Sequence, residues 1–224
     1  FTNNAEMRYG GGFIGSVGYI QAQKGRKPTI DPIHSVYYYD HRIDQSDSRL
    51  QPASPELAFL TPNIWLRDSG IDLDWPHNAA RAAQLFELES GKPVDSVVMI
   101  TPNVIKELLQ LTGPVYLKDY GFSVTSDNFL EKVQLEVEAG DDKQAGKDPK
   151  TILGVLGNAM LTKLFESTSI TSFGQYRHLV TGMTQQKQLA IYSKNNNTQR
   201  AIREVNMDGG LQPADGNYLL VAEA

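Results

Sequence analysis

Apolar residues along this chain recur at two spacings, every second residue in some segments and every third or fourth residue in others. FIGSVGYIQAQ (13–23) and PTIDPIHSVYYYD (28–40) are rich in β-branched and aromatic residues, and the turn-like KGRK between them predicts a β-hairpin. The continuous apolar run VDSVVMI (94–100) predicts a buried strand. Further strands are expected around VYL (115–117), YGFSV (120–124) and KQLAIYS (187–193).

Helical spacing governs most of the remaining chain. Residues 78–90 fit a helix with Asn78 as its N-cap and Gly91 as its stop. A second helix is expected to begin at Pro102, which suits a first helical position, and to end before Gly113. Further helices are expected over about 125–138, 149–166, 171–186 and 196–206. Strands that alternate with helices imply an α/β fold, with a central mixed β-sheet and helices packed on its faces.

Length and composition favour one folded domain. The chain has 224 residues, of which 40% are apolar, so it can bury a substantial core, and a single α/β domain over 1–224 is expected. Phe1 and the apolar run at 217–224 resemble strands cut by the chain ends, so the domain is expected to be truncated at both ends. A membrane anchor would then lie outside these residues.

Charge and residue content exclude several classes of function. The net charge is −5 and there is no basic run, which argues against nucleic acid as the partner. The absence of cysteine excludes disulfides, thiolate metal sites and a cysteine nucleophile. The four histidines form no HExxH motif, and neither a GxSxG elbow nor a GxxxxGK[ST] loop is present. Any chemistry must therefore depend on arginines and carboxylates.

The segment NNAEMRYGGGFIGS (3–16) has the pattern of an anion site. Arg8 stands shortly before Gly10, Gly11 and Gly12, whose missing side chains let backbone N–H groups approach a ligand, while a guanidinium can pair with phosphate or carboxylate oxygens. The alternative is a turn or bulge beside a solvent-exposed arginine.

Two further charged clusters could bind a ligand. One contains Arg67 and Asp68, followed by Asp72 and Asp74, and the other is DHRID (40–44), with Asp40, His41, Arg42 and Asp44. Arginines can neutralise a diphosphate, and an aspartate can coordinate magnesium or act as a base toward a hydroxyl. The alternative is that these residues form plain ion pairs that hold loops in place.

Aromatic residues next to these clusters also allow two interpretations. In a strand, Tyr37 and Tyr39 would share one face and Tyr38 the other, either for packing or as a platform for a sugar or lipid. Trp65 and Trp75 flank the RDSGIDLD loop and are expected to anchor it. The segment 41–62 is expected to be a long loop with at most a short helix at PELAFL, and such loops are often functional.

Three motifs in order resemble a bacterial family of domains of unknown function, number 4012. NNAEMRYGGGFIGS is similar to the family signature NNAELRxxGGFIGS, and WLRDSGIDLDWP (65–76) and VDSVVMITPNVIKELLQLTGP (94–114) are similar to its second and third signatures. The resemblance covers most of the chain. It implies no activity, because the family has none assigned.

A more distant similarity connects the region 79–117 to the LytR-CpsA-Psr family. A helix, then PVDSVVMI, then a helix leading into LTGPVYL, follows the order of elements in that family. The similarity implies a LytR-CpsA-Psr-like fold and an extracytoplasmic, cell-surface or membrane-anchored protein. Members are phosphotransferases that move glycans from a polyprenyl pyrophosphate carrier to the cell wall, with arginines and an aspartate holding the pyrophosphate and Mg²⁺.

Carried onto this chain, the similarity assigns roles to named residues. Arg8, Arg67 and Asp68 would be catalytic, and Asp72 and Asp74 would hold Mg²⁺. The substrate-binding set would be Asp40, Arg42, Gly10, Gly11 and Gly12, with DHRID aligned to the family's Pro-Arg-Asp motif. The expected ligand is an envelope glycan or a polyprenyl-pyrophosphate lipid.

Two departures favour a non-catalytic alternative. Tyr9 follows Arg8, where an aspartate is expected in the family's Arg-Ser-Asp-Thr motif. The region 133–153 contains no arginine, although the family has an arginine-rich motif there, and lysine lacks the planar fork that matches a diphosphate. The alternative is a binding or scaffolding module of the envelope that retains the fold.

Overall fold

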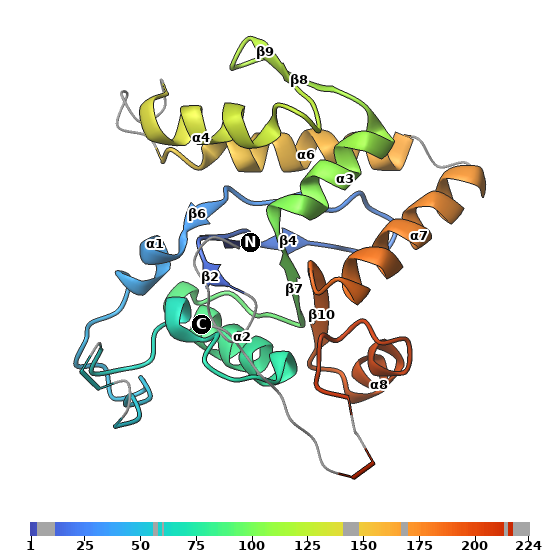
Figure 1. Cartoon of the computed structure of the whole chain (residues 1–224). Helices are drawn as coiled ribbons and strands as arrows, with labels where there is room; N and C mark the ends of the chain where they lie inside the picture. Colours follow the sequence, from blue (N-terminus) through green and yellow to red (C-terminus); the bar gives the residue numbers. More distant parts are fainter. Residues whose placement is uncertain are drawn as a thin grey trace. The chain divides into compact units, whose positions relative to one another are not determined.

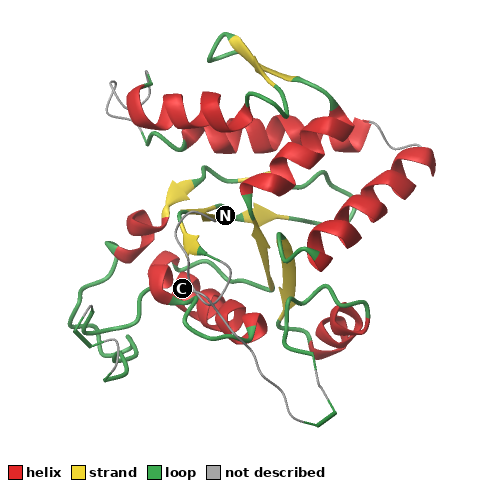
Figure 2. Ribbon diagram, viewed as in Figure 1, coloured by secondary structure: helices red, strands yellow, loops and turns green. Residues whose placement is uncertain are grey.

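The computed structural model describes residues 1–3, 12–55, 58–59, 61–140, 148–166, 170–212 and 215–216. This part of the chain is a mixed α/β structure of seven α-helices, one short 3-10 helix and ten short strands (Figure 1, Figure 2). The α/β class is confirmed. In place of one mixed sheet, the described strands pair two by two in five antiparallel sheets. Most strands have only two or three residues, which leaves little backbone for a second partner.

The described chain divides into two compact units that interleave along the sequence. Unit 1 contains Phe1, Ser16–Ser35 and Thr101–Met183, and unit 2 contains Thr2–Gly15, Val36–Ile100 and Thr184–Ala224. The single domain over 1–224 stays a prediction. Among the described residues, no helix combines the length and apolar character that a membrane crossing requires.

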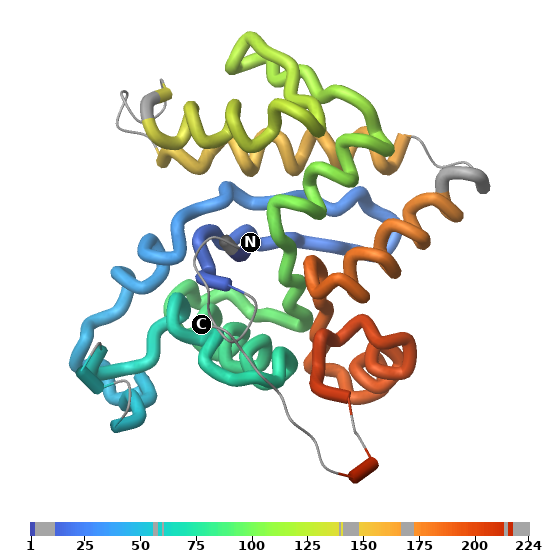
Figure 3. The backbone as a smooth tube through the Cα atoms, in the orientation of Figure 1, coloured from blue at the N-terminus to red at the C-terminus, as the bar shows by residue number. Residues whose placement is uncertain are grey.

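In unit 1, the predicted hairpin is confirmed. Its strands are β3 (Ser16–Val17), β4 (Ile20–Gln21), β5 (Thr29–Ile30) and β6 (His34–Ser35), with β4 paired to β5 and β3 to β6. The tube in Figure 3 follows the two legs as they run side by side. The two pairings are out of register by one residue. Val17 and Ile20 are three positions apart on one strand, whereas their partners His34 and Ile30 are four positions apart on the other, so the hydrogen-bond ladder is interrupted. Pro32, which lacks an N–H group, lies in this interruption.

The core of unit 1 forms where helices meet the second hairpin. The elements are α3 (Pro102–Thr112), β8 (Val115–Leu117), β9 (Phe122–Val124), α4 (Phe129–Ala139), α6 (Thr151–Glu166) and α7 (Ile170–Gln185). Helices α4 and α6 lie side by side (Figure 1). Their apolar faces, with α3, β8 and β9, bury Leu109, Val115, Leu117, Val124, Phe129, Ile152, Leu156 and Met160. These helices and strands lie close to their predicted ranges.

One asparagine joins the first hairpin to α6. Asn158 Oδ1 accepts from Ile30 N–H at 3.1 Å, and its Nδ2 donates to the Ile30 carbonyl at 3.0 Å. The side chain therefore satisfies both backbone groups of a residue 128 positions away.

Replacing Asn158 by alanine should destabilise unit 1 by about 2 kcal/mol, because it leaves the partly buried Ile30 N–H and C=O groups unpaired. Exchange of the backbone amide hydrogens of Thr29, Ile30 and Asp31 should speed up in the same variant. As a control, Gln134→Ala on α4 removes only an exposed side-chain contact to Glu138 and should change stability by less than about 0.5 kcal/mol. Equal effects of the two variants would contradict the assignment.

Unit 2 contains the longest strand pair and a helix that covers one of its faces. Strand β7 (Ser96–Ile100) pairs along its length with β10 (Leu189–Ser193), and α2 (Trp75–Ser90) packs on the pair through Trp75 and Ala79. Figure 1 shows α8 (Asn196–Glu204) beside β10. Both strands were predicted, but the prediction that β7 is buried throughout is wrong. Val98 is 49% exposed, since a two-stranded sheet has one covered face in this unit.

The tyrosine run does not form the predicted strand. Strands β1 (Thr2–Asn3) and β2 (Phe13–Ile14) pair in unit 2, and Val36–Asp40 is a helix, α1. Val36, Tyr39 and Asp40 are buried, and this i, i+3, i+4 spacing is helical, whereas Tyr37 and Tyr38 are exposed. The strand preference of tyrosine is overridden by burial of Tyr39 against Phe86, with ring centroids 5.0 Å apart.

Helix α2 begins earlier than the sequence predicts. Its N-cap is Asp74 rather than Asn78, because Pro76 fits the first turn of a helix. Asn78 lies inside the helix and its side chain bonds the backbone N–H and C=O of Asp72. The predicted stop is confirmed, since Gly91 adopts a left-handed φ of 72°.

Candidate functional site

A cleft of about 540 Å³ opens on unit 2. It is built where α1, the following loop and the 3-10 helix η1 (Leu66–Asp68) come together. Its lining residues are Tyr37, Asp40, His41, Ile43, Asp44, Gln45, Trp65 and Arg67. Two segments that the sequence singled out, DHRID and the Arg67 region, therefore share one site.

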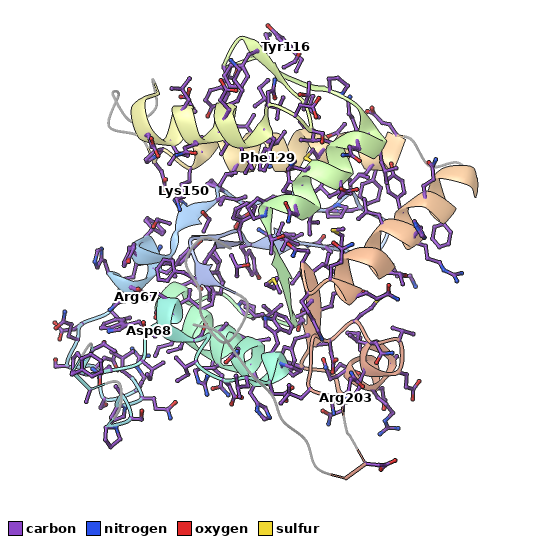
Figure 4. The ribbon with its side chains drawn as sticks, in the orientation of Figure 1. Arg67, Asp68, Tyr116, Phe129, Lys150 and Arg203 are labelled. Carbon is purple, nitrogen blue, oxygen red and sulfur yellow. The ribbon has the colours of Figure 1, made fainter. Side chains whose placement is uncertain are left out.

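Arg67 lies between aromatic rings and carboxylates on the cleft wall. Its Nη1 donates to Asp40 Oδ2 at 2.6 Å, and its Nε lies 3.6 Å from Asp68 Oδ2. The guanidinium carbon is 5.7 Å from the centre of the Tyr37 ring and 5.5 Å from that of Trp65. The side chain is still 25% exposed, and its Nη2 has no protein acceptor among the described residues. Figure 4 shows Arg67 and Asp68 together at η1.

Behind the cleft wall, Asp40 meets a second buried carboxyl group. Glu89, in the last turn of α2, is 3% exposed and accepts a hydrogen bond from Leu66 N–H at 3.1 Å. Burial, followed by the charge of Asp40, raises the pKa of Glu89 to about 8. Burial also raises the pKa of Asp40, although the hydrogen bond and charge of Arg67 act in the opposite direction. Both carboxyl groups of the pair therefore favour the protonated form more than an exposed carboxyl group does, and Arg67 opposes this shift at Asp40.

Glu89 is not among the site residues predicted from the sequence. The signal was present in the spacing of α2, because Ala79, Ala83, Phe86 and Glu89 follow one another at intervals of three or four residues. All four are buried. A glutamate on the apolar stripe of a helix predicts a paired or protonated carboxyl group.

The other residues of DHRID divide between the cleft and the surface. His41 and Asp44 line the cleft, and two hydrogen bonds from Ser46 to Asp44 lower the pKa of that carboxylate. Arg42 is not part of the lining. Its guanidinium instead donates to the Tyr38 hydroxyl at 3.2 Å and lies over the Tyr38 ring.

Asp72 and Asp74 stand at the start of α2 and not on the cleft wall. Asp72 Oδ1 accepts from Asp74 N–H, and Asp74 Oδ1 accepts from Leu211 N–H. Their second oxygens face His77, at 3.3 Å from Asp72 and 3.7 Å from Asp74. Within the described ranges, no group of three or more His, Cys, Asp or Glu side chains is placed to hold a metal ion.

Asp74 also has a tethering role. By accepting from Leu211, it connects the start of α2 to the segment after α8, where buried Asp208 pairs with Arg203 at 2.9 Å. Figure 4 places Arg203 at α8, apart from Arg67. The structure thus separates the predicted metal ligands Asp72 and Asp74 from the predicted substrate ligand Asp40 and the predicted catalytic residue Arg67.

Part of the glycine motif falls outside the described residues. Arg8, Gly10 and Gly11 lie there, so their roles stay predictions. Gly12 is described and adopts a φ of 100°, in the left-handed region that favours glycine.

The comparisons with known proteins give one match. A family model described as a protein of unknown function, DUF4012, covers residues 1–137. This range includes the cleft and all of the sequence-predicted site residues. No curated protein and no solved structure matches the chain.

Proposed function

This chain belongs to the DUF4012 family of proteins of unknown function, and we propose that it is a cell-envelope domain that binds an anionic glycan or a polyprenyl-phosphate-linked precursor. The observation that carries the proposal is the position of Arg67 in the cleft. Two of its nitrogens, Nη1 and Nε, face carboxylates, while Nη2 has no acceptor among the described residues. An arginine fixed in this way can present its remaining donors to an anionic oxygen with little loss of side-chain entropy.

The walls of the cleft suit a sugar ring beside that anion. Tyr37 and Trp65 supply aromatic surface, and Asp44 and Gln45 supply polar groups. Aromatic faces pack against the C–H surface of a sugar, whereas carboxylate and amide oxygens accept from its hydroxyl groups. The anionic oxygen could belong to a uronic acid or to a diphosphate, and the two sources are separated experimentally.

Calorimetric titration with an oligouronic acid tetrasaccharide and with geranyl pyrophosphate tests the proposal. Binding should weaken by at least about tenfold in Arg67→Lys, which keeps the charge but loses the planar fork. It should also weaken in Tyr37→Leu. Matched controls are Arg49→Lys, since Arg49 pairs with Asp47, and Tyr38→Leu, since neither residue lines the cleft.

The two ligands distinguish the sources of the anion. Preference for the tetrasaccharide would support a glycan, and preference for geranyl pyrophosphate would support the lipid-linked precursor. Equal losses in the matched controls, or no binding of either ligand by the wild type, would overturn the proposal.

A second candidate, phosphoglycan transfer, is favoured by Asp40, whose carboxyl group accepts a hydrogen bond from Arg67 in the same cleft. In this reaction, the oxygen of an acceptor hydroxyl forms a bond to the glycan-linked phosphorus and its proton passes to Asp40. The bond from that phosphorus to the polyprenyl phosphate breaks, and polyprenyl monophosphate leaves. Arg67, together with Arg8, would neutralise the diphosphate, and Asp68 would hold Arg67 in place.

This candidate also includes a LytR-CpsA-Psr-like fold, an extracytoplasmic location and Mg²⁺. Support for the fold is limited to the order α2, β7, α3 and β8, which matches the order that carries the similarity. Asp72 and Asp74 offer the hard oxygen donors that Mg²⁺ prefers, with water able to complete its shell. Release of the monophosphate from a lipid-linked disaccharide, with loss of turnover but not of binding in Asp40→Asn, would separate transfer from binding alone.

A further inference from the structure

Two buried carboxyl oxygens in unit 2 have no donor among the described hydrogen-bonding groups. They are Asp40 Oδ1 and Glu89 Oε2, while the other oxygen of each residue is bonded, to Arg67 and to Leu66 N–H respectively. An unpaired buried oxygen of this kind carries a substantial desolvation cost. The two side chains contact each other, and a hydrogen bond between their carboxyl groups satisfies both oxygens when one proton is present.

Among the residues that the structure describes, the charges around this pair come from three elements. Helix α1 supplies Asp40, η1 supplies Arg67 and Asp68, and α2 supplies Glu89. With one proton on the carboxyl pair, Asp40 and Arg67 form a neutral ion pair at the cleft wall. Without that proton, Asp40, Glu89 and Arg67 together carry a net negative charge, located directly behind the arginine that faces the cleft.

We infer that Glu89 is a positioning residue that shares one proton with Asp40, and that this proton sets the affinity of the cleft for anionic ligands. The inference rests on the proposed binding function. Glu89 does not touch the ligand but acts on it through Asp40 and Arg67. The raised pKa of Glu89, about 8, places the loss of the proton just above neutral pH. Anionic ligands should therefore bind best below that pH.

Titration of an oligouronic acid tetrasaccharide against pH tests the inference, because its carboxylates stay ionised from pH 6 to pH 9. Wild-type affinity should fall by about tenfold or more over this range, as expected when a bound proton is linked to ligand binding. Glu89→Gln should give a flat profile, because an amide can donate to Asp40 and accept from Leu66 N–H at every pH.

Two controls separate this role from others. Glu87→Gln changes the same residue type on the same helix, but Glu87 pairs with Lys194, so the wild-type profile should persist. His41→Gln removes the histidine that lines the cleft, and it should also leave the profile unchanged. A wild-type profile in Glu89→Gln, or a flat one in His41→Gln, would overturn the inference.

An infrared measurement gives a readout that does not need the ligand. The wild type minus Glu89→Gln difference spectrum at pH 6 should show the carbonyl band of a protonated carboxylic acid, and the band should be lost by pH 9. Its absence at pH 6 would overturn proton sharing. If the band is present but neither the wild type nor any variant binds the tetrasaccharide, the proposed function is contradicted. The link between the proton and ligand affinity is then contradicted as well, and only proton sharing between Glu89 and Asp40 is supported.

Discussion

Replacing Arg67 by methionine is expected to lower the free energy of unfolding by about 3–5 kcal/mol, because the change leaves a buried carboxylate without its counter-ion. The Asp40 side chain is only 1% exposed and has no other cationic partner among the described residues. Both tryptophans of the chain, Trp65 and Trp75, lie buried in unit 2. Urea unfolding followed by tryptophan fluorescence therefore measures the loss of stability in unit 2, which contains Arg67 and Asp40.

A nearby ion pair provides the comparison. Arg49 and Asp47 are joined by two side-chain hydrogen bonds, but Arg49 is 65% exposed, so Arg49→Met should cost far less stability than Arg67→Met. The double change Arg67→Met with Asp40→Asn should recover part of the lost stability, because it removes the unpaired charge. Equal costs for Arg67→Met and Arg49→Met would show that the Asp40 site is more solvated than the structure indicates.

The stability of the wild type should fall as the pH rises from about 4.5 to about 8. Replacing Glu89 by glutamine should abolish most of this fall. The pKa of Glu89 is raised from 4.5 to about 8 by burial and by Asp40, so the folded state binds the proton more tightly than the unfolded state. The stabilisation is complete below the unfolded pKa and disappears as the pH passes the folded one. At about 1.4 kcal/mol per pH unit for one proton, the wild-type loss is on the order of 3–5 kcal/mol.

Urea unfolding at a series of pH values checks this result, with Glu87→Gln as the matched control. The hydrogen bond from Lys194 lowers the pKa of Glu87, so its stabilisation is present above the unfolded pKa and is lost as the pH falls. The two variants should therefore change the pH dependence in opposite directions. A Glu89→Gln profile parallel to that of the wild type would contradict a raised pKa at Glu89.

Sequence reasoning succeeded where local signals and tertiary packing agree. Gly91 ends α2 and Pro102 begins α3, because backbone requirements at helix ends are local and residue-specific. It failed at Val36–Asp40, where tyrosine favours a strand but the burial of Val36, Tyr39 and Asp40 favours a helix. The pairing of strands into sheets could not be predicted either, because strands of two or three residues have too few alternating apolar positions to specify their partners.

The candidate site shows the same division. Arg67 and Asp40 were each singled out by residue type, but the sequence alone could not show that they pair across 27 positions. That contact depends on the packing of α1, η1 and α2. Glu89 could have been identified from helical spacing, whereas its partner could not. Asp72 and Asp74 were grouped with Arg67 by proximity in sequence, and the turn before α2 takes them away from the cleft wall.

The interleaving of the two units has a consequence for how this chain folds during synthesis. The hairpin Ser16–Ser35 needs Asn158 to complete the hydrogen bonds of Ile30, and β7 needs Leu189–Ser193 as its partner. Both closures bring together residues about 90 or more positions apart, and loop closure over such distances is slow. During synthesis, the edges of the hairpin and of β7 therefore stay unpaired until Asn158 and Leu189–Ser193 have been added to the chain.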